Sequence, residues 1–224
     1  MRIIVTGSEG LIGKSIVEFL ISSGHECLCL DYSNGDDLTD EEYVRDYFKN
    51  NKAECLINLF ALNHHVDNQF AKEDLFNITL ESFRQYMETN LTALFSVCRE
   101  FARNNSAGKI INFSSTYGVV SPRKELYDQG EKHIGYSVSK AGVLMLSKHL
   151  ATHLAPQITV NAVIPGGVLN NQDEEFIKKY SLQTPLGRMM NVEELNGIIG
   201  FLISEKSNYV TGAEFKIDGG WTAW

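Results

Sequence analysis

The chain has 224 residues, of which 43% are hydrophobic and 21% are charged, as is usual for a single globular domain. Its 20 Lys and Arg residues against 28 Asp and Glu residues give a formal net charge of −8, which argues against a nucleic-acid-binding or anionic-membrane-binding surface. No apolar run approaches the roughly 20 residues that a bilayer span requires, and the amino terminus lacks a signal-peptide pattern. We therefore expect a cytoplasmic protein whose four cysteines are reduced thiols.

Short apolar segments alternate with longer amphipathic segments along the chain. The segments with strand-like patterns are Arg2–Thr6, Glu26–Leu30, Glu54–Leu59, Lys109–Phe113, Ile158–Ile164 and Glu214–Ile217. The segments with helical spacing are Leu11–Ser22, Asp40–Asn50, Leu80–Asn104, Tyr136–Leu154 and Val192–Ser204. Several strands are apolar on both faces, as in a sheet that helices cover on both sides. The pattern predicts an α/β fold with a doubly wound parallel sheet of the Rossmann type, in one domain over residues 1–224.

A glycine-rich turn, TGSEGLIG over residues 6–13, separates the first predicted strand from the first helix. Gly7 suits a tight turn, a side-chain-free Gly10 allows the backbone to approach a pyrophosphate, and Gly13 allows close packing of helix on strand. The first N–H groups of the helix would then face the phosphates. This position after the first strand favours a dinucleotide site over a purely structural turn.

Asp31 ends the second predicted strand, 18 residues after Gly13. A carboxylate there can accept hydrogen bonds from both hydroxyls of an adenosine ribose, whereas a 2′-phosphate would meet its negative charge. Glu9 adds a second negative charge, and the turn itself contains no Lys or Arg. These residues favour NAD(H) over NADP(H); the alternative is a solvated acidic strand end.

Tyr136 and Lys140, in the segment YSVSK, are one helical turn apart, so both side chains leave the same face of the helix. A phenol with an ordinary pKa near 10 is a poor base at neutral pH, and a nearby ammonium would favour the phenolate. Such a tyrosine could take a proton from an alcohol or return one to a ketone. Upstream, the strand KIINF ends in Ser114 and Ser115, whose hydroxyls could hold a substrate oxygen.

These motifs occur in an order that resembles the short-chain dehydrogenase/reductase family over essentially the whole chain. They are the TGxxGxxG turn, Asp37-Leu38, Asn58 to Ala61, Asn90, INFSS, YSVSK, NAVIPGGV and TGAEFKIDGGW. The resemblance implies an oxidoreductase that interconverts a secondary alcohol and a ketone with NAD(H), without a metal.

The resemblance also implies roles for individual residues. Tyr136 would be the general acid and base, Lys140 would lower the pKa of Tyr136 and bind the nicotinamide ribose, and Ser115 would polarise the substrate carbonyl. Asn90 would hold a proton-relay water by distorting its helix. Asp37 and Leu38 would contact the adenine, and the backbone of Val168 would hold the carboxamide. The full set of expected cofactor contacts is Gly7, Glu9, Gly10, Leu11, Ile12, Gly13, Asp31, Asp37, Leu38, Asn58, Ala61, Tyr136, Lys140, Pro165, Gly166 and Val168.

The chain also departs from the family pattern. The turn has the TGxxGxxG spacing of the family's larger sugar-nucleotide branch, and NLFA replaces the usual NNAG at residues 58–61. Only five residues separate Asp31 from Asp37, so the usual helix and strand between them should be reduced to a short loop. The charged segment 123–133 lengthens the connection from Ser115 to Tyr136. It suits a polar or ionised substrate, such as a sugar derivative, with a solvated surface loop as the alternative.

A looser resemblance, carried by TGxxGLxG and by SSTYGVVSP at residues 114–122, is to family members associated with surface-polysaccharide, nonulosonate or flagellin-glycan biosynthesis. Three alternatives remain open: a 3-oxoacyl reductase, an epimerase or lyase that uses NAD transiently, and a non-catalytic nucleotide-sensing protein.

Further expectations concern the lid, the assembly and the histidines. Segment 169–180 would be a lid over the site. The resemblance implies a homo-oligomer, a tetramer or a dimer, and the two tryptophans of the ending GWTAW would be buried on a neighbouring subunit. His149 and His153 have metal-ligand spacing, but with no third ligand we interpret them as helix surface. His64-His65 is interpreted as an exposed pair.

Overall fold

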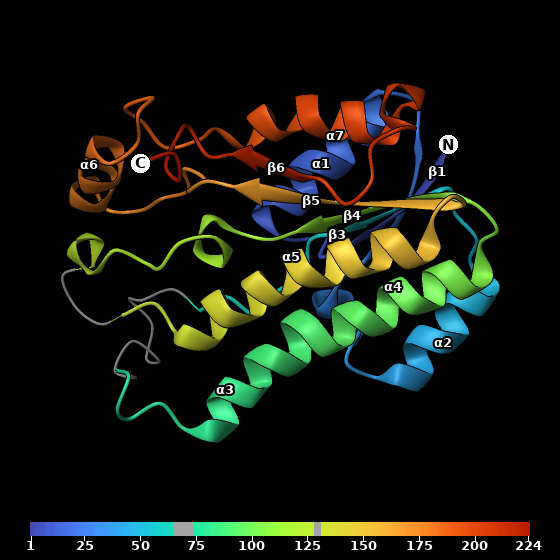
Figure 1. The fold of residues 1–224 in the computed structure, drawn as a ribbon, viewed down its shortest axis with the longest axis horizontal. Coiled ribbons are helices and arrows are strands. Elements are labelled where there is room, and N and C mark those ends of the chain that lie inside the picture. Colours follow the sequence, from blue (N-terminus) through green and yellow to red (C-terminus); the bar gives the residue numbers. More distant parts are fainter. Residues whose placement is uncertain (65–73, 128–130) are drawn as a thin grey trace.

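Six strands in the described part of the chain form one parallel sheet with the order β2-β1-β3-β4-β5-β6 (Figure 1). The structure is a computed structural model that describes residues 1–64, 74–127 and 131–224. The strands are β1 (Arg2–Thr6), β2 (Glu26–Leu30), β3 (Cys55–Asn58), β4 (Gly108–Phe113), β5 (Ile158–Pro165) and β6 (Glu214–Ile217). The predicted doubly wound parallel sheet is confirmed, and each predicted strand is present to within two residues at either end.

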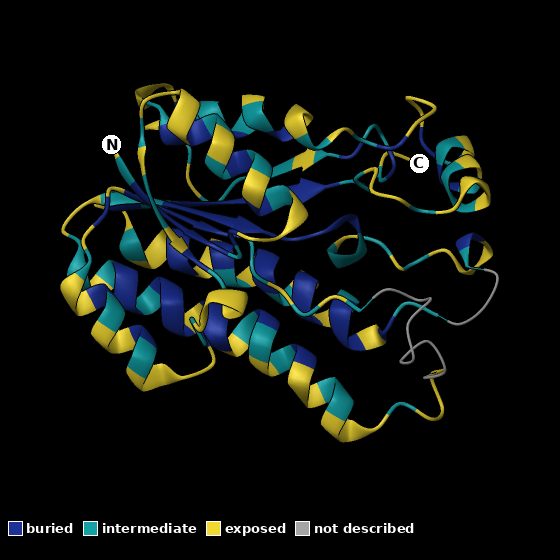
Figure 2. Cartoon of the chain, turned by 180° about the vertical axis from the view of Figure 1, so that it is seen from behind, coloured by how far each residue is buried: buried dark blue, intermediate teal, exposed yellow. Residues whose placement is uncertain are grey.

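Helices cover both faces of this sheet (Figures 1 and 2). The helices are α1 (Leu11–Ser22), α2 (Glu41–Asn50), α3 (Leu80–Met87), α4 (Ala93–Asn104), α5 (Ile134–Leu154), α6 (Glu174–Leu182) and α7 (Asn196–Ile203). Within β1, Ile4 packs in the core with α2, α4 and α5, whereas Ile3 and Val5 pack in the core with α1 and α7. Strands buried on both faces therefore lie between two apolar cores, as their sequences predict. No helix in the described residues is both long and apolar enough to cross a membrane.

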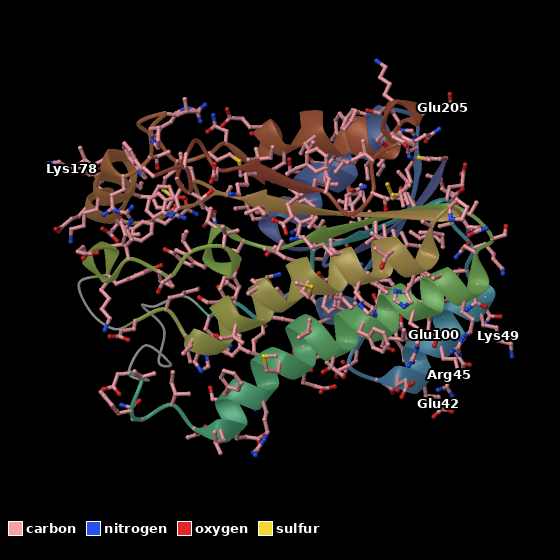
Figure 3. All side chains as sticks on the ribbon, in the orientation of Figure 1. Glu42, Arg45, Lys49, Glu100, Lys178 and Glu205 are labelled. Carbon is pink, nitrogen blue, oxygen red and sulfur yellow. The ribbon has the colours of Figure 1, made fainter. Side chains whose placement is uncertain are left out.

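Charged residues lie on the outer surfaces of this layered structure (Figure 3). Glu42, Arg45 and Lys49 are exposed along α2, which packs beside α4. One exception is Glu100 of α4, a fully buried carboxylate that pairs with Arg99 at 3.0 Å. Arg99 in turn contacts a carboxylate of α2, so ion pairs link these two helices on the outside of the sheet.

The connection from β2 to α2 is short, as expected. A single 3-10 turn, Tyr32–Asn34, follows Asp31, and Gly35 with φ of 93° reverses the chain. Left-handed φ is the conformation that glycine adopts at no steric cost. Because this connection contains no strand, β2 is the edge of the sheet and Asp31 lies at the end of the edge strand.

The long helix predicted over residues 80–104 is interrupted. Five residues, Glu88–Thr92, form a π-helical turn between α3 and α4, and Asn90 lies within it. Single π-helical turns are uncommon and occur frequently at functional sites. The distortion agrees with what the family resemblance implies for Asn90.

The carboxyl ends of the strands all point toward the end of the molecule that carries α6 and the C terminus (Figure 1). Segments that leave β1, β3, β4 and β5 therefore meet there: the glycine turn, Leu59 to Ala61, the two serines after β4, and Gly166 to Val168. Ligands of open α/β sheets bind in the crevice at this edge.

Candidate active site

The three glycines of the first turn have different surroundings. Gly7 has φ of +72°, and a Cβ there would lie 2.5 Å from the backbone nitrogen of Phe60. A Cβ on Gly13 would lie 2.1 Å from the carbonyl oxygen of Gly7, so close packing of α1 requires glycine. A Cβ on Gly10 would meet only the oxygen of Gly7, at 3.4 Å. Internal packing therefore requires the first and third glycines, and the second faces open space where a ligand could approach the backbone.

The amino terminus of α1 is suited to an anion. No side chain caps it and its first turn contains no acidic residue, so its first N–H groups are not satisfied by a protein side chain. Its first three residues line a cleft of about 360 Å³ that runs along the carboxyl edge of the sheet. Other residues that line this cleft are Gly7, Gly10, Leu59, Ala61, Ser114, Ser115, Tyr117, Lys132, Tyr136, Lys140, Pro165, Gly166 and Val168.

Tyr136, Lys140 and Ser115 meet at the centre of the cleft. Tyr136 and Lys140 come from the first two turns of α5, and the Lys140 Nζ lies 6.0 Å from the centroid of the Tyr136 ring. The Ser115 hydroxyl lowers the pKa of the Tyr136 phenol, so the two side chains are near one another. The Lys140 Nζ donates to the carbonyl of Phe113, the last residue of β4, at 2.9 Å. The end of β4 thus positions both the hydroxyl and the ammonium.

A second contact fixes α5 against the segment after β4. The Ser114 hydroxyl donates to the carbonyl of Lys140 at 2.7 Å. A Cβ on Gly118 would lie 2.7 Å from both that carbonyl oxygen and the Ser114 Oγ. Glycine at position 118 therefore lets the chain pass directly over the helix backbone at Lys140.

Burial determines the titration of both groups on α5. Burial raises the pKa of Tyr136, and the hydrogen bond from Ser115 opposes that rise. Burial also lowers the pKa of Lys140 to about 8. Burial is the dominant effect on the pKa of Tyr136, and the Lys140 ammonium donates to the Phe113 carbonyl. The role of Lys140 in lowering the pKa of Tyr136 stays a prediction.

Asn90 is buried and joins three segments. Its Oδ1 accepts from the N–H of Leu62 at 2.6 Å, and its Nδ2 donates to the carbonyl of Leu62 at 3.1 Å and to the Ser139 Oγ at 3.0 Å. The Ser139 hydroxyl donates to the carbonyl of Tyr136 at 2.9 Å. The π-helical turn therefore places Asn90 between the segment after β3 and the helix that carries Tyr136. Its role in holding a water stays a prediction.

Asp31 lies beside the glycine turn. Its carboxylate accepts from the Glu9 N–H at 3.0 Å, from the Ser33 N–H at 2.9 Å and from the Ser33 hydroxyl at 2.7 Å. Although partial burial opposes the effect, these hydrogen bonds hold the pKa of Asp31 below its ordinary value. Lys14, which follows the turn, pairs with Glu9 at 3.5 Å. An acidic group thus stands at the end of β2, and the nearest lysine of α1 is paired.

Other expected cofactor contacts are placed differently. Leu38 is buried in the core with α2 and α4. Asn58 is buried and donates to Asn112 at 2.8 Å. The Asp37 carboxylate accepts from the N–H and the hydroxyl of Thr39, at 2.9 and 2.6 Å. The side chains of Leu38 and Asn58 therefore have internal structural roles, whereas Ala61, Pro165, Gly166 and Val168 line the cleft as expected.

The cleft has an aromatic wall that the sequence pattern did not predict. Four aromatic residues from three separate segments line it: Tyr117, Tyr127, Phe176 and Tyr180. The hydroxyls of Tyr117 and Tyr127 are 2.9 Å apart, and the Tyr180 hydroxyl accepts from the Gly167 N–H at 2.5 Å. The residues after Leu169, including α6, thus line the cleft where a lid was predicted, but no local pattern indicates that these rings converge.

The C-terminal tail corrects another expectation. Trp221 is 2% exposed within its own chain, with its ring stacked on Tyr180 at a centroid distance of 4.3 Å. Trp224 is 70% exposed. The first tryptophan therefore supports the aromatic wall from behind rather than packing on a neighbouring subunit.

The charged segment 123–133 contributes to the cleft. Residues 128–130 of this segment lie outside the described residues, as does His65. The Lys132 Nζ lies 4.7 Å from the centroid of the Tyr136 ring and donates to the carbonyl of His64 at 3.0 Å. The described part of the segment thus brings a cation beside Tyr136, which favours the polar-substrate interpretation over a loop that is only solvated.

The histidine pair on α5 forms a surface stack. The rings of His149 and His153 are 4.2 Å apart, and the His153 Nδ1 lies 2.9 Å from the carbonyl oxygen of His149. Both side chains are exposed, in agreement with the helix-surface interpretation.

Replacement of Lys140 by methionine should raise the free energy of unfolding at pH 7 by about 1–3 kcal/mol. Burial lowers the pKa of Lys140 to about 8 from 10.5, so the folded state carries an unfavourable buried ammonium below pH 8. Between pH 8 and 10.5 the Lys140 amine keeps its proton only in the unfolded state, so the free energy of unfolding of the wild type rises with pH. The stability difference between Lys140→Met and wild type should therefore shrink over this range. Urea unfolding of both proteins at pH 7 and at about pH 10 measures this difference. An equal or lower stability of the variant at pH 7 would contradict the prediction.

Comparison with known proteins gives one family and several relatives. Residues 13–222 match the family described as Enoyl-(Acyl carrier protein) reductase. Post-translational flagellin modification protein A of Campylobacter coli is 32% identical, in a match that covers 71% of this chain and 64% of that protein. A 3-oxoacyl-acyl-carrier-protein reductase of Aquifex aeolicus is 30% identical, and the match covers 97% of this chain and 95% of that protein.

Solved structures agree in fold. A short-chain dehydrogenase of Leptospira borgpetersenii with bound NAD+ has a TM-score of 0.88 at 31% identity, covering 99% of this chain and 92% of that one. A proposed 2-deoxy-D-gluconate 3-dehydrogenase of Agrobacterium tumefaciens with bound NADP has a TM-score of 0.85 at 26% identity, covering 100% of this chain and 96% of that one.

Proposed function

Because the chain belongs to the short-chain dehydrogenase/reductase family, an oxidoreductase family that acts on alcohol and ketone groups, we propose that it interconverts a secondary alcohol and a ketone on a polar small molecule with NAD(H). One observation carries this proposal. Ser115, Tyr136 and Lys140 line the same cleft as the glycine turn, at the carboxyl edge of the parallel sheet.

The residues present fit a dinucleotide. The uncapped amino terminus of α1 and the open space at Gly10 suit a pyrophosphate, and Asp31 suits ribose hydroxyls. The segment from Pro165 to Val168, with Lys140, would hold the nicotinamide end. When bound, NAD(H) would supply or accept the hydride.

The chain's own residues would move the proton. Ser115 and Tyr136 both line the cleft and are near one another, so a substrate oxygen bound between them would meet two hydroxyls. Tyr136 would give its proton to the oxygen of a ketone or take one from an alcohol. Lys140 and the Asn90–Ser139 contacts would position α5 and relay the proton.

The proposed preference for NAD(H) rests on charge. Asp31 and Glu9 stand where a 2′-phosphate would have to approach, and Lys14 is paired with Glu9. The Leptospira relative binds NAD+, and the Agrobacterium relative binds NADP. The relatives therefore do not indicate one cofactor, and the proposed preference rests on the residues of this chain. Their negative charges favour NAD(H), which lacks the 2′-phosphate.

The proposed substrate class is a sugar derivative. The amide side chains of Asn63, Asn170 and Gln172 and the ammonium of Lys132 line the cleft together with the aromatic wall. Hydroxyl groups need hydrogen-bonding partners of this kind, and aromatic rings offer flat apolar faces. Relatives named for flagellin modification and for 2-deoxy-D-gluconate oxidation support this class.

A second candidate is reduction of a 3-oxoacyl thioester. Its support is the Aquifex relative, which matches nearly the whole chain, and the description of the matched family. The Asp31 carboxylate, which accepts from the Glu9 N–H, places a negative charge at the cofactor site, and polar side chains line the cleft near Tyr136. Both observations favour the first candidate.

We also propose a homo-oligomer. Phe95 of α4 and Val138 and Met145 of α5 are exposed, and Met145 is 65% exposed. Large apolar side chains that a helix exposes to solvent would be covered in a subunit interface.

Turnover by the purified protein tests the proposal. NADH absorbance would be followed with a panel of keto-sugars and keto-sugar acids and, separately, with acetoacetyl-CoA, using Ser115→Ala as the inactive control. We expect NADH to be consumed with polar ketones and not with the thioester. Consumption with the thioester alone would support the second candidate. A product formed without net change in NADH would indicate an epimerase or lyase, and NADH binding without any product would indicate a nucleotide-sensing protein.

A further inference from the structure

A histidine caps the amino terminus of α5, the helix that carries Tyr136 and Lys140. The Nδ1 of His133 accepts from the backbone N–H of Gly135 at 3.0 Å. The carbonyl of the same residue accepts from the backbone N–H of Tyr136, also at 3.0 Å. His133 therefore bonds two of the first N–H groups of the helix, including that of the residue that would transfer the proton.

The imidazole of His133 is also fixed to α3. Its ring is stacked on the ring of Tyr86, with a centroid distance of 4.2 Å and an angle of 14°. Its Nε2 lies 3.0 Å from the hydroxyl oxygen of Ser82. A Cβ on Gly135 would lie 2.9 Å from both the imidazole Nδ1 and the Cβ of Tyr86. The absence of a side chain at position 135 therefore makes room for both the cap and the ring stack.

This arrangement requires a particular protonation state. A nitrogen that accepts from a backbone N–H carries no proton, so the cap needs the neutral imidazole with its hydrogen on Nε2, where it can donate to Ser82. A second proton on Nδ1 would point at the N–H of Gly135 and place a positive charge at the positive end of the helix dipole. Protonation would therefore break the cap.

The described groups around His133 come from α3, α5, the segment after β3 and the segment before α5. Among the described residues, the nearby titratable side chains are those of Tyr86, His64, Lys132 and Tyr136. The Tyr86 hydroxyl lies 3.3 Å from the Nδ1 of His64. On the same segment Glu131 pairs with Lys124, and on α3 Glu81 pairs with Arg84 at 3.9 Å. Within the described residues, both of these carboxylates have cationic partners.

We propose that His133 is a positioning residue whose neutral imidazole locks the start of α5 onto α3 and holds Tyr136 in place. The proposal rests on the proposed function for its catalytic consequence. The lock opens when the imidazole is protonated, so proton transfer by Tyr136 is lost on the acid side through a group that does not touch the substrate.

Two variants of His133 separate the cap from simple packing. Asparagine is a strong helix N-cap that accepts the same hydrogen bond but does not titrate, and alanine caps poorly. Urea unfolding without ligand, and kcat and KM with saturating NADH and the panel ketone of highest turnover, would be measured for wild type, His133→Asn and His133→Ala from about pH 5.5 to about pH 8.5. An ordinary imidazole titrates near pH 6.5, within this range.

We expect His133→Asn to match wild type at about pH 8 and to exceed it in both stability and kcat at about pH 5.5. His133→Ala should have a kcat about tenfold lower than that of His133→Asn at every pH, with an unchanged KM for NADH, and its deficit relative to wild type should shrink toward about pH 5.5. The proposal is overturned if His133→Asn loses stability and kcat below about pH 6.5 in parallel with wild type. It is also overturned if His133→Ala keeps the wild-type kcat.

Two further results can be interpreted without ambiguity. If His133→Ala does not fold, the comparison of His133→Asn with wild type still decides the question. If no panel ketone is turned over by any of the proteins, the proposed function fails, whereas the unfolding measurement, which needs no substrate, still tests the cap.

Discussion

Replacement of Tyr136 by phenylalanine should lower kcat by on the order of 10³-fold. The phenol lines the cleft near Ser115 and is the group that can exchange a proton with a substrate oxygen. Phenylalanine keeps the ring and its packing, so NADH binding, followed by nicotinamide fluorescence, should be unchanged. The measurement is steady-state NADH turnover with the best panel ketone, together with the fluorescence titration.

Tyr127→Phe is the matched control. Tyr127 is also a phenol in the cleft and is hydrogen-bonded to Tyr117, but it belongs to the aromatic wall and not to α5. We expect its effect on kcat to be less than about tenfold, because it removes one neutral hydrogen bond and no proton-transfer group. Equal losses of kcat in the two variants would refute the assignment of Tyr136 as the acid and base.

The same assignment predicts a direction for pH dependence. Burial raises the pKa of Tyr136, so alcohol oxidation, which needs the deprotonated phenol, should increase with pH through the neutral range. Ketone reduction needs the protonated phenol and should not decline until higher pH. The hydrogen bond from Ser115 lowers the pKa of Tyr136, so any residual oxidation by Ser115→Ala should rise at higher pH than in wild type.

Replacement of Asp31 by alanine should weaken NADH binding by about 10-fold to 100-fold, since it removes a charged acceptor of hydrogen bonds. NADPH binding should be unchanged or tighter, because the variant removes a negative charge from the position that a 2′-phosphate would approach. The preference for NADH should therefore weaken or reverse. Titration of both cofactors, followed by nicotinamide fluorescence, measures the two dissociation constants.

Asp31→Asn separates charge from local structure. The Asp31 carboxylate also accepts from the backbone N–H groups of Glu9 and Ser33, so alanine could disturb the turn itself. Asparagine keeps an acceptor for these groups but carries no charge, so it should improve NADPH binding while retaining more NADH affinity than alanine. If both variants bind the cofactors as wild type does, Asp31 is a structural cap of its turn and does not select the cofactor.

Local sequence patterns were sufficient for the strands, for most of the helices and for the central pair of the site, but they missed α6 and the π-helical turn at Glu88–Thr92. The apolar run of β1 ends just before Gly7, and that of β2 ends just before Asp31. Tyr136 and Lys140 share a helix face because they are four residues apart. The short Asp31–Asp37 connection determined that β2 would be an edge strand. All of these features depend on residues close in sequence, whose spacing and turn chemistry can be read directly.

Tertiary packing decided what surrounds those residues. The burial that raises the pKa of Tyr136 comes from segments far apart in the chain, and the aromatic wall draws on three of them, with Trp221 packed behind it. Leu38 and Asn58 match a family motif, yet their side chains are buried by distant helices and strands. Because burial and nonlocal contacts are properties of the folded chain, the sequence by itself determined which groups carry the chemistry, and the tertiary structure alone decided their environment.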